Sequence, residues 1–104
     1  MSLVHVVAII TTKPGKRDEV LKAFAANMHN VHAEDGCIEY GPAIDAVQVG
    51  DFQTQIGPDT FMVIEKWESL EHLRAHASTP HMAEYAAKVK HLLIDRIIHV
   101  LSPT

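Results

Sequence analysis

Residues 61–82 constrain the fold more than any other stretch, because their hydrophobic period changes partway along. Residues 61–67 form an apolar run of strand length, and helical spacing begins after Ser69. Strand alternation puts four side chains on one face: Phe61, Val63, Glu65 and Trp67. If other elements cover this face, the carboxyl group of Glu65 must find a partner or stay neutral.

The chain that precedes this stretch begins with the pattern of a strand and a helix. Residues 3–12 are rich in Val, Ile and Thr, which predicts a strand that is apolar on both faces. Apolar residues recur at helical spacing over 16–34, and Gly36 follows where a helix would end. We therefore expect a strand that is covered on both sides, followed by an amphipathic helix.

Residues 37–45 predict a second strand, although Gly41-Pro42 interrupts it. Proline cannot donate a ladder hydrogen bond, so this strand is expected at an edge or with a bulge. Residues 46–60 mix apolar side chains with glycine, aspartate and proline, which predicts a long loop with room for a short strand near 50–56. A loop of this length in a small domain usually carries function or an interface.

Two helices and a last strand follow residues 61–67. Ser69 is a natural cap for a short helix to Ala77, and Thr79-Pro80 provides the cap and first residue of another. The apolar stripe of this second helix is Met82, Tyr85, Ala86, Val89 and Leu93. Residues 94–101 predict the fourth strand.

The order of these elements predicts one α+β domain over residues 1–104. Strand, helix, strand, strand, helix pair and strand is the ferredoxin-like β-α-β-β-α-β order, with an antiparallel sheet and its helices on one face. The other sheet face is also apolar, and nothing else in the chain is left to cover it. We therefore expect a second copy of the chain to do so, as a homodimer.

Composition excludes several kinds of partner and site. The net charge is −4 and the nine Lys and Arg are scattered, so nucleic acid is not expected. The single cysteine, Cys37, excludes an internal disulfide and fits a reducing cytoplasm. No apolar run reaches the ~20 residues that span a bilayer, so membrane insertion is not expected.

Histidine is the most numerous polar residue among the candidates for a functional site, and the spacing of the histidines allows three interpretations. His72 and His76 lie four residues apart on one helix face, but a zinc site usually needs a third ligand, and no HExxH motif or cysteine pair supplies one. The second reading is a solvated His72 with His76 packed at the helix end. The third makes His76 a hydrogen-bond donor or proton shuttle in a cleft.

Other reactive residues give weaker indications. Trp67 stands at the junction of strand and helix, where it packs in the core or forms the wall of a cavity, and Tyr40 and Tyr85 are equally ambiguous. Cys37 follows a helix C-terminus, which disfavours a thiolate nucleophile. No GxSxG, P-loop or GxGxxG motif occurs, so neither a covalent mechanism nor a nucleotide cofactor is indicated.

Several motifs together resemble the antibiotic biosynthesis monooxygenase (ABM) family, over nearly the whole chain. They are Glu65-Lys66-Trp67-Glu68-Ser69, the HxxTPH run His76-Ala77-Ser78-Thr79-Pro80-His81, Lys13-Pro14-Gly15, Glu34-Asp35-Gly36-Cys37, Tyr40-Gly41-Pro42 and Gly57-Pro58-Asp59. The likeness is greatest to the quinol monooxygenase type. These motifs are specific for the superfamily and say little about the substrate.

The resemblance implies a homodimeric α+β barrel that oxidises quinols or related phenolic polycyclic compounds with O₂, without metal, flavin or other cofactor. It implies three catalytic residues: His76, Trp67 and Glu65. It implies a substrate pocket between sheet and helices, lined by Tyr40, Phe24, Met28, Met82, Tyr85 and His81. Such a pocket needs a proton acceptor and donors that hold the phenolate oxygens.

Relatives with other activities define the alternatives. Haem-degrading relatives use an Asn on the first strand, and residues 3–12 contain none, so haem oxygenation is disfavoured. An isomerase of a phosphorylated sugar carries a similar HxxTPH segment, but a phosphate site would want more basic residues than Lys66 and Arg74. A non-catalytic, quinone-binding dimer of the same fold is the remaining alternative.

Overall fold

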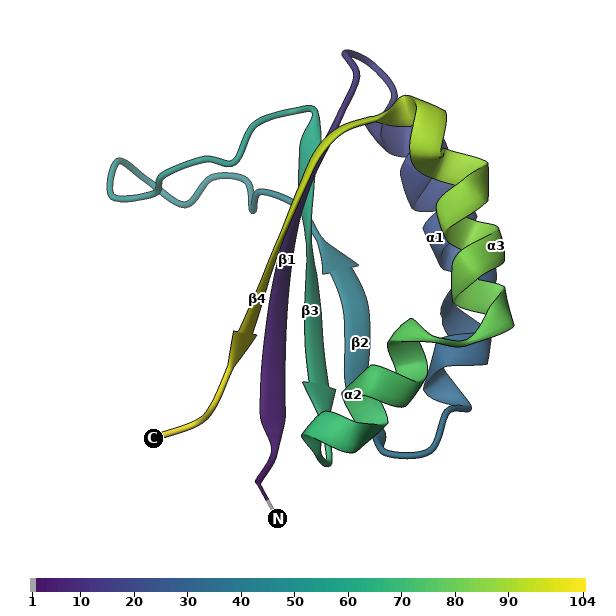
Figure 1. Ribbon diagram of the computed structural model, residues 1–104. Coiled ribbons are helices and arrows are strands. Elements are labelled where there is room, and N and C mark those ends of the chain that lie inside the picture. The colour runs from purple at the N-terminus through teal and green to yellow at the C-terminus, as the bar shows by residue number, and fades with distance from the viewer. Residues whose placement is uncertain (1) are drawn as a thin grey trace.

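A four-stranded antiparallel sheet with helices on one face makes up the computed structural model, which describes residues 2–104 (Figure 1). The strands are β1 (Val4–Thr12), β2 (Cys37–Ala43), β3 (Thr60–Trp67) and β4 (Leu93–Leu101), in the order β2-β3-β1-β4. The helices are α1 (Arg17–His32), α2 (Leu70–Ala77) and α3 (Pro80–Val89), with a 3₁₀ turn, η1 (Lys90–Leu92), before β4. This is the predicted ferredoxin-like α+β arrangement. Among residues 2–104, no helix is both long and apolar enough to cross a membrane.

The two faces of the sheet differ in cover. Along β1 and β3, residues alternate between buried and half-buried, and the buried ones face the helices. Phe61 and Trp67 of β3 and Val20 and Val31 of α1 are fully buried in this core. The half-buried residues point to the opposite face and include Val7, Ile9 and Ile64. Within residues 2–104, no helix covers that face (Figure 1).

Element boundaries depart from the predictions at a few positions. The first helix ends at His32, and the second strand ends at Ala43. That strand is an edge strand with a register shift near its start, as its proline indicated. Residues 50–56 form no strand. Leu93 begins β4 instead of extending the stripe of α3, because its backbone is already extended.

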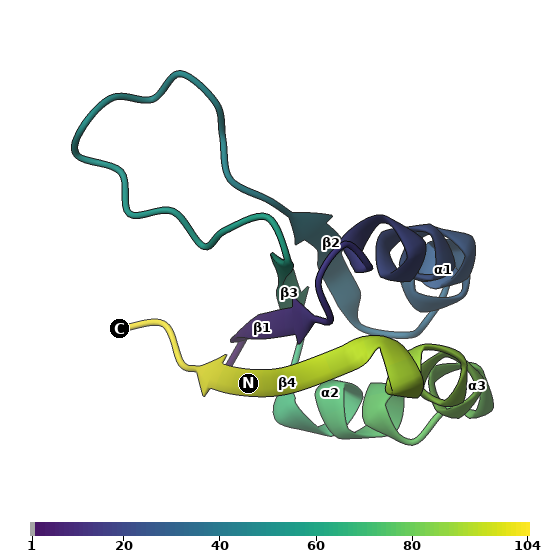
Figure 2. The ribbon, with the colours of Figure 1, turned by 90° about the horizontal axis from the view of Figure 1, so that it is seen from above.

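The long loop between β2 and β3 projects to the side of the sheet away from the helices (Figures 1 and 2). Asp45 holds its two ends together, since its carboxylate oxygens accept hydrogen bonds from the Ile56 and Gly57 backbone N–H groups, each at 2.9 Å. The far part of the loop exposes apolar side chains, and Phe52 is 86% exposed.

The turn after α1 packs tightly against the start of α2. Gly36 has a φ of +81°, and a Cβ atom there would overlap the His72 side chain. The Gly36 carbonyl also accepts a hydrogen bond of 2.9 Å from the Glu68 backbone N–H. Ser69 caps α2 by accepting from the His72 backbone N–H at 3.2 Å. These contacts fix the end of α1 against the first turn of α2.

Substituting two glycines tests this packing. Gly15 has a similar φ of +77° with open space around its Cα, so Gly15→Ala is expected to cost only the left-handed backbone penalty, about 1–2 kcal/mol. Gly36→Ala carries the same penalty plus an overlap with His72, which adds roughly 1–3 kcal/mol. Urea unfolding measures both free energies. Equal losses would show that His72 moves aside freely.

Candidate active site

A cavity of about 440 Å³ lies between the covered face of the sheet and the helices. All three helices and all four strands contribute to its wall. It is mostly apolar, with a few polar groups that converge on it, as ligand sites usually are. Six of the nine predicted site residues line it: Phe24, Tyr40, Glu65, His76, Met82 and Tyr85.

Glu65 is the acid on the covered face of the sheet. It is 8% exposed, and its Oε1 accepts a hydrogen bond of 2.9 Å from Trp67 Nε1. Burial raises the pKa of Glu65 above its ordinary value, whereas the Trp67 hydrogen bond and the nearby His76 oppose this rise and Glu34 adds to it. A carboxyl group with a raised pKa at a cavity wall suits proton transfer near neutral pH.

Trp67 stands behind this wall. It is 0% exposed and does not line the cavity, so its indole acts on the cavity through its neighbours. Its ring lies 4.7 Å from the His76 ring, centroid to centroid, at an interplanar angle of 34°. Trp67 therefore positions Glu65 by a hydrogen bond and His76 by ring contact.

His76 forms a pair with a carboxylate that the sequence did not single out. Its Nδ1 lies 2.9 Å from Glu34 Oε2, and both side chains are largely buried. Because an ionised carboxylate only accepts hydrogen bonds, Nδ1 carries the proton in this pair. The Nε2 atom makes no hydrogen bond within residues 2–104 and is not sealed from solvent. His76 can therefore offer Nε2 to a molecule in the cavity.

His81 and Met28 lie outside the cavity wall. His81 Nε2 is 3.1 Å from Glu34 Oε2 without the alignment of a hydrogen bond, and its Nδ1 is 3.1 Å from Asn27 Nδ2. Met28 packs against the core from α1. Both side chains support the residues that face the cavity, and neither touches it directly.

Aromatic rings form the middle of the cavity. Phe24 and Tyr40 stack at 5.1 Å, and Tyr85 meets Phe24 edge-on at 5.8 Å. Burial raises the pKa of Tyr40 far above its ordinary value and the pKa of Tyr85 to about 12. Both phenols therefore keep their protons at neutral pH, so they can donate hydrogen bonds to an oxygen atom in the cavity.

The histidine pair on α2 does not converge. His72 turns to Ser69, with 2.7 Å between Nδ1 and Oγ, whereas His76 turns to Glu34. Among residues 2–104, no three His, Cys, Asp or Glu side chains gather as a metal site would require. Burial, with Glu34 and Glu65 nearby, raises the pKa of Cys37, which favours the thiol over the thiolate.

Two residues of this region had no role in the sequence analysis. Glu34 was only the end of a helix and part of a family motif, although an acid just before a glycine turn is well placed to contact the next element. Arg96 lines the cavity from β4. Strand alternation could have indicated this position, because it puts Arg96 on the same sheet face as Ile98 and Val100.

Replacing Glu65 by Gln tests its burial through the pH dependence of stability. A raised pKa in the folded state means that wild-type stability falls as pH rises through that pKa. Gln has no charge to bury and can still accept from Trp67. We therefore expect Glu65→Gln to gain stability relative to wild type as pH increases from about 4 to about 8.

Chemical unfolding of both proteins at several pH values measures this difference. The measurement at the lowest pH is the internal control, since the side chains of Glu65 and of the substituted Gln are then both uncharged. A difference that does not change with pH would contradict the raised pKa.

Known proteins resemble this chain over most of its length. A family model described as "Antibiotic biosynthesis monooxygenase" matches residues 3–88. "Probable quinol monooxygenase YgiN" of Escherichia coli (strain K12) is 40% identical over 103 residues, which span 97% of this chain and 98% of that protein.

Solved structures show the same fold. Rv0793 from Mycobacterium tuberculosis superposes with a TM-score of 0.80 at 27% identity, covering 99% of this chain and 96% of that one. A conserved protein from Methanosarcina mazei Go1 superposes with a TM-score of 0.84 at 22% identity, covering 100% of this chain and 95% of that one. By its match to the family model and its near full-length identity, this chain belongs to the antibiotic biosynthesis monooxygenase family.

Proposed function

We propose that this protein is a cofactor-independent monooxygenase that oxidises quinols or related phenolic polycyclic compounds with O₂. The observation that carries the proposal is the cavity in which Glu65, with its raised pKa, and the free Nε2 of His76 share an apolar, aromatic wall. The name of the Escherichia coli relative supports the substrate class.

The proposed reaction begins with a proton transfer. The ionised form of Glu65 or Nε2 of His76 accepts a proton from the quinol, and the resulting phenolate is electron-rich enough to reduce O₂ itself. One oxygen atom replaces a ring hydrogen and the other leaves as water, so quinol and O₂ give hydroxyquinone and water. The quinol supplies every electron, and the balance needs no further reductant.

The remaining side chains stabilise charge and exclude water. The hydroxyl groups of Tyr40 and Tyr85 are protonated donors that can hold a phenolate oxygen. Phe24 and Met82 provide apolar walls that strengthen these interactions by keeping water out. Trp67 keeps Glu65 in place, and Glu34 keeps His76 in place.

We further propose that two copies associate through the uncovered sheet face, in a reducing cytoplasm. The face is apolar over three strands, with Val7, Ile64 and Ile97 among its residues, and the long loop projects on the same side. An apolar face of this kind is typical of a subunit interface.

Oxygen uptake with a panel of naphthohydroquinones tests the activity, after subtraction of quinol autoxidation. We expect uptake that a chelator does not change. His76→Ala and Glu65→Gln are each expected to lower kcat/KM by about 10²–10⁴-fold, the usual contribution of a proton-transfer group. Trp67→Phe, which removes the hydrogen bond to Glu65, is expected to lower it as well.

His91→Ala is the matched control, because His91 is exposed on η1 and does not line the cavity. Wild-type rates in both Trp67→Phe and His76→Ala would refute the assignment. Tight quinone binding without turnover would favour the non-catalytic alternative.

A pair of neighbouring substitutions tests the homodimer. Ile97 and Ile98 are 44% and 49% exposed, but they pair with Ile9 and Ala8 of β1 and so point to opposite sheet faces. Ile97→Glu is expected to give monomers in analytical ultracentrifugation, and Ile98→Glu to remain dimeric. A dimer that survives Ile97→Glu would place the interface elsewhere.

A further inference from the structure

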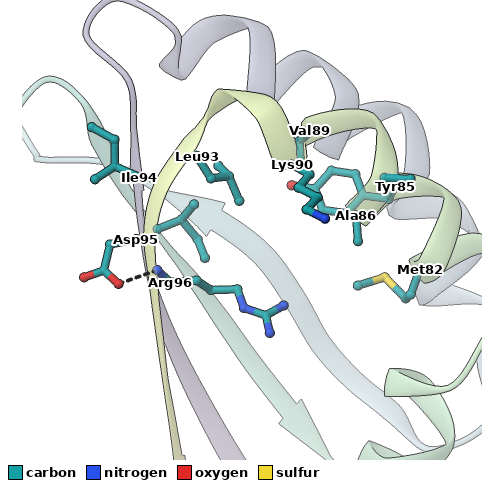
Figure 3. A pocket seen from close by; sticks show the side chains of 11 residues that line it. Met82, Tyr85, Ala86, Val89, Lys90, Leu93, Ile94, Asp95 and Arg96 are labelled. Atoms are coloured by element: carbon teal, nitrogen blue, oxygen red, sulfur yellow. Dashed lines mark hydrogen bonds between the residues drawn. The ribbon is translucent and has the colours of Figure 1, made fainter.

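Arg96 is an exposed residue of β4 that lines the cavity. Its partner across the ladder is Ile10, which is buried on the helix side of β1, so the Arg96 side chain also lies on that side. Figure 3 shows it reaching from β4 into the gap toward Met82 and Tyr85 of α3. A second cavity of about 390 Å³ occupies this gap.

The two cavities adjoin. Ile10, Met82, Tyr85, Ala86 and Arg96 line both. Together they exceed the space that a fused two-ring system needs, and they fall in the usual range for small-molecule sites. A ring that lies against Tyr85 in the first cavity can therefore extend a substituent into the second.

The guanidinium of Arg96 is free to bind such a substituent. It makes no hydrogen bond and no ion pair with any residue from 2 to 104. Asp95 is the nearest acid in sequence and also lines the second cavity, but its Oδ1 accepts a hydrogen bond of 2.9 Å from the Arg96 backbone N–H and not from the guanidinium (Figure 3). Lys90 adds a second positive charge to the second cavity. Of residues 2–104, Arg96 is the one arginine or lysine that lines the first cavity.

The acid and the cation lie at opposite ends of the site. Glu65 pairs across the ladder with Val6, and Arg96 pairs with Ile10, four residues further along β1. Strand geometry puts their backbones about 16 Å apart, on two strands that flank β1.

We propose that Arg96 recognises an anionic substituent, and that the substrate is a carboxylated aromatic quinol whose carboxylate pairs with its guanidinium. A planar guanidinium binds carboxylate through two parallel hydrogen bonds, which also fixes the orientation of the ring. The carboxylate at Arg96 directs the hydroxyl groups of the ring toward Glu65 and His76. That the substrate is a quinol rests on the proposed function, whereas its carboxylate is inferred from the Arg96 site alone.

The site can be tested without turnover by comparing the binding of two probes that share the same ring system and differ only in the charge of one substituent. Isothermal titration calorimetry compares a naphthoate with the matching naphthamide. Wild type is expected to bind the naphthoate about tenfold more tightly or better, the usual effect of a charged hydrogen bond. Arg96→Gln is expected to remove this preference and to leave naphthamide binding unchanged.

Arg74→Gln is the matched control, since Arg74 is an exposed arginine on α2 that lines neither cavity. It is expected to keep the wild-type preference. Equal binding of the two probes, a preference that survives Arg96→Gln, or no binding of either probe would overturn the inference. An Arg96-dependent preference in a protein that consumes no oxygen would uphold the carboxylate site and refute the monooxygenase proposal.

Discussion

The hydrogen bond from the Trp67 indole to the Glu65 carboxyl group is the interaction on which the site depends. A carboxyl group on a covered sheet face loses its hydration, and without a partner this costs several kcal/mol. The indole N–H is the donor that this face provides, two residues along the same strand. One bond thus satisfies two buried polar groups and leaves a carboxyl group of raised pKa at the wall of an apolar cavity.

A second constraint brings the helices to this carboxyl group. The turn at Gly36 lies so close to His72 that no side chain fits there, and this contact holds the end of α1 against the start of α2. Glu34 lies in the turn after α1 and His76 lies on α2, 42 residues apart in sequence, and the contact at Gly36 holds these two segments together. Backbone packing outside the cavity therefore determines how an imidazole inside it is oriented.

The cavity is polar at both ends and apolar between them. Glu65 and His76 occupy the end where three helices and the sheet meet, and Arg96 occupies the end beside β4. Aromatic rings line the middle, where a flat ligand has the most contact area. A ligand in such a site is oriented by the charge at each end as well as by the shape of the walls.

The sequence by itself determined the order of elements and the edge position of β2, because hydrophobic period and capping residues act over short distances, and it indicated six of the side chains that line the cavity. It also indicated Glu65, since an acid in line with apolar strand residues is a local pattern. Only the tertiary structure decided that Trp67 lies behind the wall, that Glu34 pairs with His76 and that Arg96 is open to the cavity. Each of these depends on how distant elements pack, and no local spacing encodes that packing.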